Sequence, residues 1–71
     1  MINTNEFKAA MLRAGFSMAA LAKMIGISTA SLSYKVNNRR EFTTTEIKSA
    51  SAALNLSVDE RDLIFFADHV E

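Results

Sequence analysis

The sequence predicts an all-α fold: a single compact domain of five short helices that takes in residues 1–71. Two observations lead to this prediction. Apolar residues recur in several separate stretches at the i, i+3, i+4, i+7 spacing of a buried helix face. Asn, Ser or Thr precedes each of these stretches, and such residues accept hydrogen bonds from the first free amides of a helix. The chain also contains no proline, and no stretch alternates apolar and polar residues as a half-buried strand would.

The first expected helix begins after Asn3 and runs to about Ala14. Asn3 and Glu6 have the spacing of a capping box, in which two side chains each bond to the other residue's backbone amide. Gly15 ends the helix. The inward stripe comprises Phe7, Met11 and Ala14, with Met11 filling the core.

Residues 18–38 predict two short helices joined by a tight turn. Ser17 caps the first helix, and Gly26 ends it by adopting a positive φ. Ser28 caps the second, which spans residues 29–37. The inward side chains of this pair are Met18, Leu21, Ala22, Ile25, Leu32 and Val36, and the second helix presents Ala30, Ser33, Tyr34 and Asn37 on its other side. The pair therefore buries one face and presents the other.

Two more helices are expected after a polar connection, in which Phe42 fills the core. Thr43 and Glu46 form a second capping box, and the following inward residues are Ile47, Ala50, Ser51 and Leu54. Asn55 is expected to end this helix by adopting a left-handed backbone conformation. Ser57 and Glu60 form the third box and open a fifth helix, which carries Leu63, Phe66, Ala67 and Val70 on one side.

The fifth helix contains the apolar run Leu63-Ile64-Phe65-Phe66. A helix turns about 100° per residue, so that if Leu63 and Phe66 face the core, Phe65 points nearly opposite. A domain of this size is not expected to bury all four side chains. The sequence therefore predicts a protein interface here, made by Ile64, Phe65 and Phe66, for a two-fold dimer or for another protein. The alternative is that the fold buries the whole run.

The central pair resembles the helix-turn-helix of the phage repressor and Cro-like DNA-binding family. The resemblance rests on Leu21-Ala22, Gly26-Ile27-Ser28 and Leu32. More narrowly, LSYKVNNRREFTTTEIKSA resembles small regulators of phages of Gram-positive bacteria, and the resemblance covers nearly the whole chain. It implies a lambda-repressor-like arrangement of the helices, in which the second helix of the pair enters the major groove of operator DNA.

Carried over residue by residue, the resemblance implies a set of DNA contacts. The base-reading surface would comprise Ser28, Thr29, Ala30, Ser33, Tyr34 and Asn37. Asn37 or Asn38 would bond an adenine edge. Phosphates would be reached by Lys35, Arg39 and Arg40, and by the amides near Ser17. For Tyr34, a half-buried surface position is an equal alternative to a phosphate contact.

The charges are distributed unevenly along the chain although the formal net charge is zero. Residues 1–40 contain six Lys and Arg and one acidic residue, whereas residues 41–71 contain two Lys and Arg and seven acidic residues. This asymmetry fits a basic face for nucleic acid and an acidic end turned away from it. Ordinary solvated surface in both halves is the alternative.

Two departures from the family pattern support a second hypothesis. Met18 stands where members that bind DNA tightly usually have glutamine, and the first turn of the second helix lacks Arg, Lys, Gln and Asn. We therefore expect modest base specificity. The alternative function is a protein-binding modulator or antirepressor that uses the same fold to bind a partner repressor and block its DNA contacts. Met18 and Met24 would suit such a partner.

The sequence shows no recognisable set of catalytic residues. The chain has no cysteine and two glycines, and its one histidine, His69, stands near the C-terminus without companions. We therefore expect no enzyme activity, metal, cofactor or small-molecule ligand. An apolar run near 18 residues is also absent, as is a charged-then-apolar leader, so neither a membrane span nor a signal peptide is expected. The expected location is the cytoplasm, and the expected partners are operator DNA, a second copy of the chain or a partner repressor.

Overall fold

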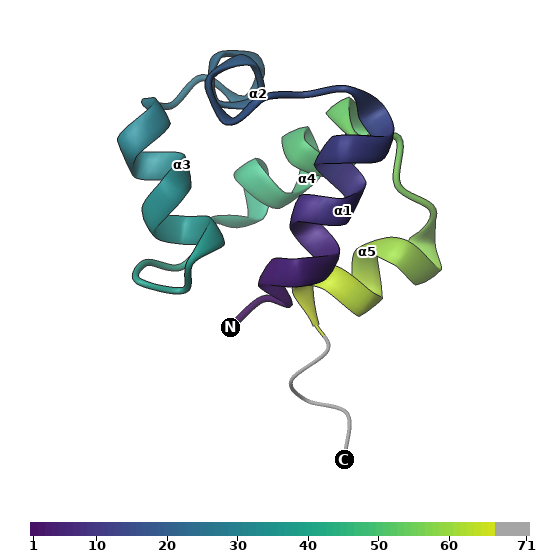
Figure 1. Ribbon diagram of the computed structural model, residues 1–71. Helices are drawn as coiled ribbons and strands as arrows, with labels where there is room; N and C mark the ends of the chain where they lie inside the picture. Colours follow the sequence, from purple (N-terminus) through teal and green to yellow (C-terminus); the bar gives the residue numbers. More distant parts are fainter. Residues whose placement is uncertain (67–71) are drawn as a thin grey trace.

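Five helices make up the described part of the chain, which in this computed structural model comprises residues 1–66 (Figure 1). In chain order they are α1 (Thr4–Ala14), α2 (Met18–Ile25), α3 (Thr29–Val36), α4 (Thr44–Ala53) and α5 (Val58–Phe65). Residues 1–66 contain no strand. The prediction of an all-α fold with five short helices is confirmed.

The predicted cap is present at the start of every helix. The side chains of Asn3, Ser17, Ser28, Thr43 and Ser57 each accept a hydrogen bond from the backbone amide three residues later. Thr43 with Glu46 and Ser57 with Glu60 form complete, reciprocal capping boxes. At α1 the structure shows the Asn3 half of the predicted box, a bond of 3.2 Å from the Glu6 amide. Local side-chain chemistry thus sets where each helix begins.

Left-handed residues end three of the helices, as predicted, and Asn38, with φ 64°, follows α3 in the same way. Gly15 has φ 77°, Gly26 has φ 90° and Asn55 has φ 54°. Chain neighbours aside, no heavy atom lies within 4 Å of the position that a Cβ would take at either glycine. The backbone conformation, and not a lack of space, therefore favours glycine at these two turns.

All five helices contribute to one core. Its largest fully buried side chains are Phe7, Leu21, Leu32, Val36 and Ile64. Phe42 packs against this core from the connection between α3 and α4, as predicted, and its ring stacks on Phe7 with centroids 5.7 Å apart. Met11 is also buried, in agreement with the prediction. In α1, however, Ala10 is buried and the predicted Ala14 is exposed, because Ala14 lies in the last turn, where the chain departs towards α2.

The prediction for the apolar run of α5 is wrong. Ile64 and Phe65 are only 1% and 5% exposed, whereas Leu63 and Phe66 are 49% and 37% exposed. The reason is a cluster of three rings: Phe65 meets Phe7 and Phe42 edge to face, with centroids 5.9 and 5.4 Å apart. Ile64 and Phe65 are therefore core residues and do not form a surface interface, and of the three predicted interface residues only Phe66 is exposed.

A backbone hydrogen bond fixes the same orientation of α5. The Asn3 amide donates to the Ile64 carbonyl over 2.7 Å, joining the segment before α1 to the end of α5. Ala67 and Val70, which were expected to extend the inward side of this helix, and His69 lie outside the described residues.

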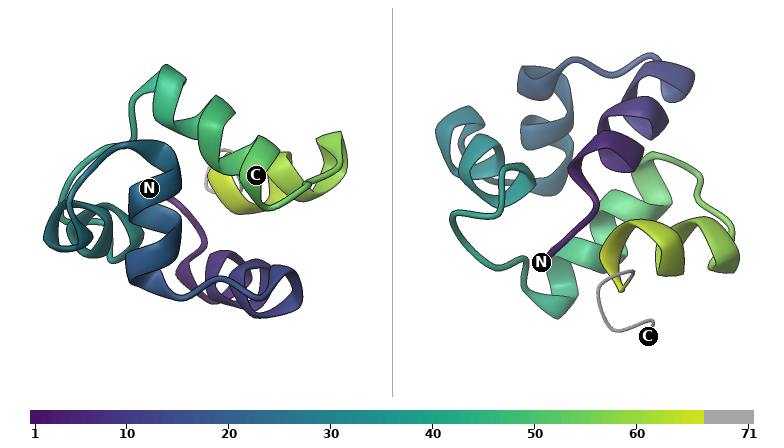
Figure 2. Two further views of the ribbon diagram at one scale, coloured as in Figure 1. Left: turned by 90° about the horizontal axis from the view of Figure 1, so that it is seen from above. Right: turned by 60° about the horizontal axis from the view of Figure 1, so that its bottom comes forward.

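The two helices at the edges of the domain are α3 and α5. In both figures they lie on opposite sides, with α1, α2 and α4 between them (Figures 1 and 2). α2 packs against α3 and α4, and α1 packs against α5. None of the helices within residues 1–66 combines the length and the apolar character that a membrane span requires.

Candidate nucleic-acid interface

The α2–turn–α3 unit is held together by its backbone and its buried side. The amides of Gly26 and Ile27 both donate to the Ala22 carbonyl, over 2.9 and 3.0 Å, and so close the turn. Ser28 then caps α3. The inward side chains Leu21, Ala22, Leu32 and Val36 are all buried. This packing fixes which side of α3 faces solvent.

The outward surface of α3 matches the predicted base-reading set in position. Ser28, Thr29, Ala30, Tyr34 and Asn37 are exposed, and Ser33 is half-buried. Ser33, Tyr34, Asn37 and Arg39 line one shallow hollow of about 390 Å³. The side chains over the first turn are short and uncharged, so they can approach a surface closely but offer few hydrogen bonds.

Arg40 and Tyr34 form a cation–π contact at the C-terminal end of this surface. The Arg40 guanidinium carbon lies 5.0 Å from the centroid of the Tyr34 ring. The backbone places Arg39 beside it, since the Arg39 amide donates to the Tyr34 carbonyl over 2.8 Å. Both arginines are exposed, and neither has an acidic partner within residues 1–66. Two exposed positive charges therefore lie just after α3, where an anion can bind them.

Lys35 does not belong to this surface, contrary to the prediction. Its side chain is only 11% exposed, and its Nζ lies 2.6 Å from both carboxylate oxygens of Glu46 in α4. The Glu46 carboxylate also accepts from the Thr43 amide in the capping box. A lysine that is paired in this way cannot reach a DNA phosphate without breaking the pair. Lys35 instead links α3 to α4.

The pKa of Glu46 reflects this environment. Burial acts to raise it, but the hydrogen bonds from Lys35 and Thr43, together with the positive charge of Lys35, outweigh burial and lower the pKa below its ordinary value. The carboxylate is therefore charged at neutral pH and complements the lysine. Sequence periodicity offers no signal for this pair, because its members lie on different helices and are separated by a turn.

Asn38 is also structural, which corrects its predicted role at a base edge. It has φ 64°, and its Oδ1 accepts from the Ile2 amide over 2.7 Å while its Nδ2 donates to the Ile2 carbonyl over 3.0 Å. Next to it, the Thr4 hydroxyl donates to the Val36 carbonyl over 2.7 Å. These bonds fasten the N-terminal segment to the end of α3. Asn37 remains exposed, although its Nδ2 donates to the Ser33 carbonyl over 2.9 Å.

The remaining predicted contacts lie on α2 and at its N-cap. Ser17 is exposed, and its hydroxyl caps the helix by accepting from Ala20 over 3.1 Å. Met18 is half-buried and packs against the core. Met24 is 63% exposed. Within residues 1–66, no cluster of three or more acidic, His or Cys side chains is arranged to hold a metal ion.

Comparison with known proteins gives one match. A family model described as helix-turn-helix (HTH_3) matches residues 7–61, which include α1 to α4 almost completely and the first half of α5. No curated protein and no solved structure matches the chain.

Proposed function

The chain belongs to the helix-turn-helix family, and from this premise we propose that it is a phage-type transcriptional regulator that binds operator DNA through α3 and the residues after it. The observation that supports this proposal best is the exposed surface of α3, which is followed by two exposed arginines, Arg39 and Arg40, without an acidic partner within residues 1–66. Bound at a promoter, such a domain would repress transcription by excluding polymerase or a competing repressor.

Phosphate contacts supply most of the affinity in this proposal. Arg39 and Arg40 supply exposed positive charges just after α3, and the amides at the start of α2 near Ser17 add neutral donors. Over the first turn of α3, Thr29 and Ala30 can contact a thymine methyl group, and the hydroxyls of Ser28 and Ser33 can each make a single hydrogen bond. The first turn of α3 contains no Arg, Lys, Gln or Asn that could bond a base in two places, so we expect the complex to discriminate weakly between base sequences.

A salt series tests this proposal. The protein is titrated into a fluorescein-labelled duplex from the intergenic region beside its own gene, with an unrelated duplex as the control, and anisotropy is read at several salt concentrations. We expect binding at low salt that weakens as salt rises, because bound counterions are released from the phosphates. Undetectable binding at low salt, or binding that does not depend on salt, would contradict the proposal.

A protein-binding modulator is the second candidate. The observation that favours it is the uncharged outward surface of α3 together with the exposed side chain of Met24 on α2, since a flexible thioether suits a protein contact. In this case the chain would bind a partner repressor and block the repressor's DNA contacts. Co-expression with the neighbouring repressor, followed by size-exclusion chromatography, distinguishes the two candidates. Co-elution without DNA binding by the chain supports the modulator, and separate elution rules it out.

A further inference from the structure

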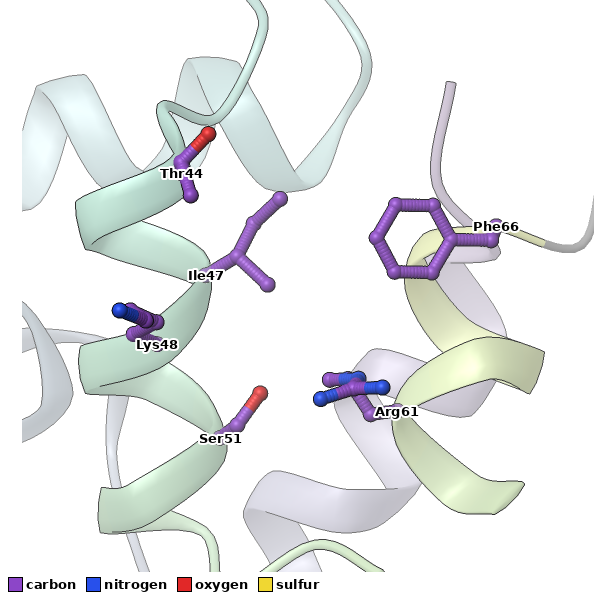
Figure 3. A pocket seen from close by; sticks show the side chains of 6 residues that line it. All are labelled: Thr44, Ile47, Lys48, Ser51, Arg61 and Phe66. Carbon is purple, nitrogen blue, oxygen red and sulfur yellow. The ribbon is translucent and has the colours of Figure 1, made fainter. Parts of the chain in front are cut away.

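A groove between α4 and α5 has no role in the proposed function. α4 contributes Thr44, Ile47, Lys48 and Ser51 to its walls, and α5 and its C-cap contribute Arg61 and Phe66. Figure 3 shows Ile47 and Phe66 facing each other at one end, and the Ser51 hydroxyl facing the Arg61 guanidinium further along. The groove is about 410 Å³ in volume.

Two polar atoms in this groove lack a hydrogen-bond partner. Within residues 1–66, the buried side-chain polar atoms without a partner are Ser51 Oγ and Arg61 Nε, and both residues line this groove. The outer end of the Arg61 guanidinium contacts its neighbour, with Nη2 3.5 Å from Asp62 Oδ1. A buried donor without an acceptor is costly, and folded proteins keep few of them. Their convergence on one groove points to an acceptor that residues 1–66 do not supply.

The charges of the groove specify that acceptor. Two of the six lining residues, Lys48 and Arg61, are cationic, and none is acidic. Lys48 makes no ion pair within residues 1–66. Ile47 and Phe66 add apolar surface beside these donors. The groove thus combines an apolar end with a donor-rich end, a combination that suits a peptide with adjacent apolar and acidic side chains better than it suits a fully hydrated phosphate.

We infer that the α4–α5 groove binds an acidic, apolar segment of a partner protein. An apolar side chain of the segment lies between Ile47 and Phe66, and a neighbouring carboxylate accepts hydrogen bonds from Arg61 Nε and Ser51 Oγ. Because α3 and α5 lie on opposite sides of the domain, a segment bound against α5 leaves the outward surface of α3 accessible to DNA. The inference is therefore independent of which function α3 serves.

The test uses a synthetic amphipathic peptide of about four helical turns with Glu and Leu on one face, and a matched peptide with Gln in place of each Glu. Each is titrated into the full chain, uniformly labelled with ¹⁵N, and amide and Arg Nε–H signals are followed by NMR. We expect the acidic peptide to shift the signals of Ser51, Arg61 and Phe66 and the Gln peptide to bind at least about tenfold more weakly, since charge-assisted hydrogen bonds are lost.

Two substitutions isolate the proposed donors. Arg61→Lys keeps the charge but removes Nε–H, and Ser51→Ala removes the hydroxyl. Each is expected to weaken binding of the acidic peptide several-fold, and Ser51→Ala is expected to leave the melting temperature unlowered, because its hydroxyl has no partner in the fold. Arg13→Lys is the matched control: it makes the same exchange at an arginine that contacts Glu60 outside the groove, and it is expected to leave binding unchanged.

Three outcomes would overturn the inference. The first is no shift at millimolar peptide, and the second is a set of shifts confined to α3. The third is dimerisation of the free chain that Arg61→Lys abolishes, since the occupant would then be a second copy. A duplex titration of Arg61→Lys separates this inference from the proposed function: we expect unchanged DNA affinity, and a marked loss would assign the groove to DNA phosphates instead.

Discussion

A run of polar residues lies at the end of α3, and a run of apolar residues lies at the end of α5. At the end of α3, four polar residues compete for the surface: Lys35 and Asn38 are engaged within the fold, whereas Arg39 and Arg40 are exposed. At the end of α5, four apolar residues compete for the core: Ile64 and Phe65 are buried, whereas Leu63 and Phe66 are exposed. In both runs, neighbouring residues of one kind are divided between two environments.

The comparison shows that partners distant in the sequence decide this division. Glu46 draws Lys35 inward and Ile2 holds Asn38, while Phe7 and Phe42 receive Phe65. Neither the charge of a residue nor its hydrophobicity identifies it as structural or available. Substitutions that compare an inward residue with its outward neighbour therefore test the account directly.

The largest expected effect belongs to Phe65. Phe65→Ala removes a ring that contacts two others and should cost about 3–5 kcal/mol, enough to unfold most of a domain this small. Phe65→Leu, which keeps most of the volume, should fold and cost about 1–2 kcal/mol. Urea unfolding followed by circular dichroism measures both. Leu63→Ala is the matched control and should cost less than about 1 kcal/mol, because Leu63 is half exposed. The reverse ranking would mean that α5 is rotated.

The pair of Lys35 and Glu46 ranks next. Lys35→Met should lower the free energy of unfolding by about 2–3 kcal/mol, because it leaves a largely buried carboxylate without its cation. The double variant Lys35→Met/Glu46→Leu should recover most of the loss, since neither charge remains. Equal losses in the single and double variants would contradict a mutual interaction.

The pH dependence of stability checks the same pair. The pKa of Glu46 is lower in the folded chain than in the unfolded chain, so its contribution to stability is complete above the unfolded value, about 4.5. This contribution to stability is lost as the pH falls through the pKa of Glu46 in the folded chain. Glu46→Gln should therefore be less stable than the wild type at pH 7, and the difference should shrink progressively below about pH 4. Parallel pH profiles for the two proteins would show that the lowered pKa contributes nothing.

Asn38 should show a smaller effect, with a backbone part and a side-chain part. Asn38→Ala loses both hydrogen bonds to Ile2. It also places alanine, which is strained in the left-handed region, at φ 64°. Together these changes should lower the free energy of unfolding by about 2 kcal/mol. Asn38→Gly relieves the backbone and should recover about half of that. Thermal unfolding measures the series, with Asn37→Ala as the exposed control at under about 0.5 kcal/mol. Equal losses at both asparagines would contradict the structural role of Asn38.

Local chemistry explains what the sequence predicts well. The caps at Asn3, Ser17, Ser28, Thr43 and Ser57 and the left-handed stops act over one helical turn, so the helix boundaries and the α2–turn–α3 unit could be predicted. The outward position of most of the candidate DNA contacts followed from Leu32 and Val36, which fix the inward side of α3.

Tertiary contacts explain what could not be predicted. The apolar run of α5 does not by itself say which of its side chains face inward, and the rings of Phe7 and Phe42, together with the bond from the Asn3 amide to the Ile64 carbonyl, fix the observed orientation. Likewise, a lysine in the last turn of α3 and an asparagine just after the helix suit DNA as well as they suit the fold until Glu46 and Ile2 are placed beside them. The groove between α4 and α5 depends on a pairing of helices that carries no sequence motif.

The most direct test of the central claim, that Arg39 and Arg40 but not Lys35 contact DNA phosphates, is the slope of log affinity against log salt. Arg39→Ala/Arg40→Ala should reduce the magnitude of this slope by about 1.8, because each lost phosphate contact removes about 0.9. Lys35→Met/Glu46→Leu and Thr29→Ala should leave the slope unchanged. A slope that falls by about one in the Lys35 variant, while the double arginine variant binds like the wild type, would contradict the account.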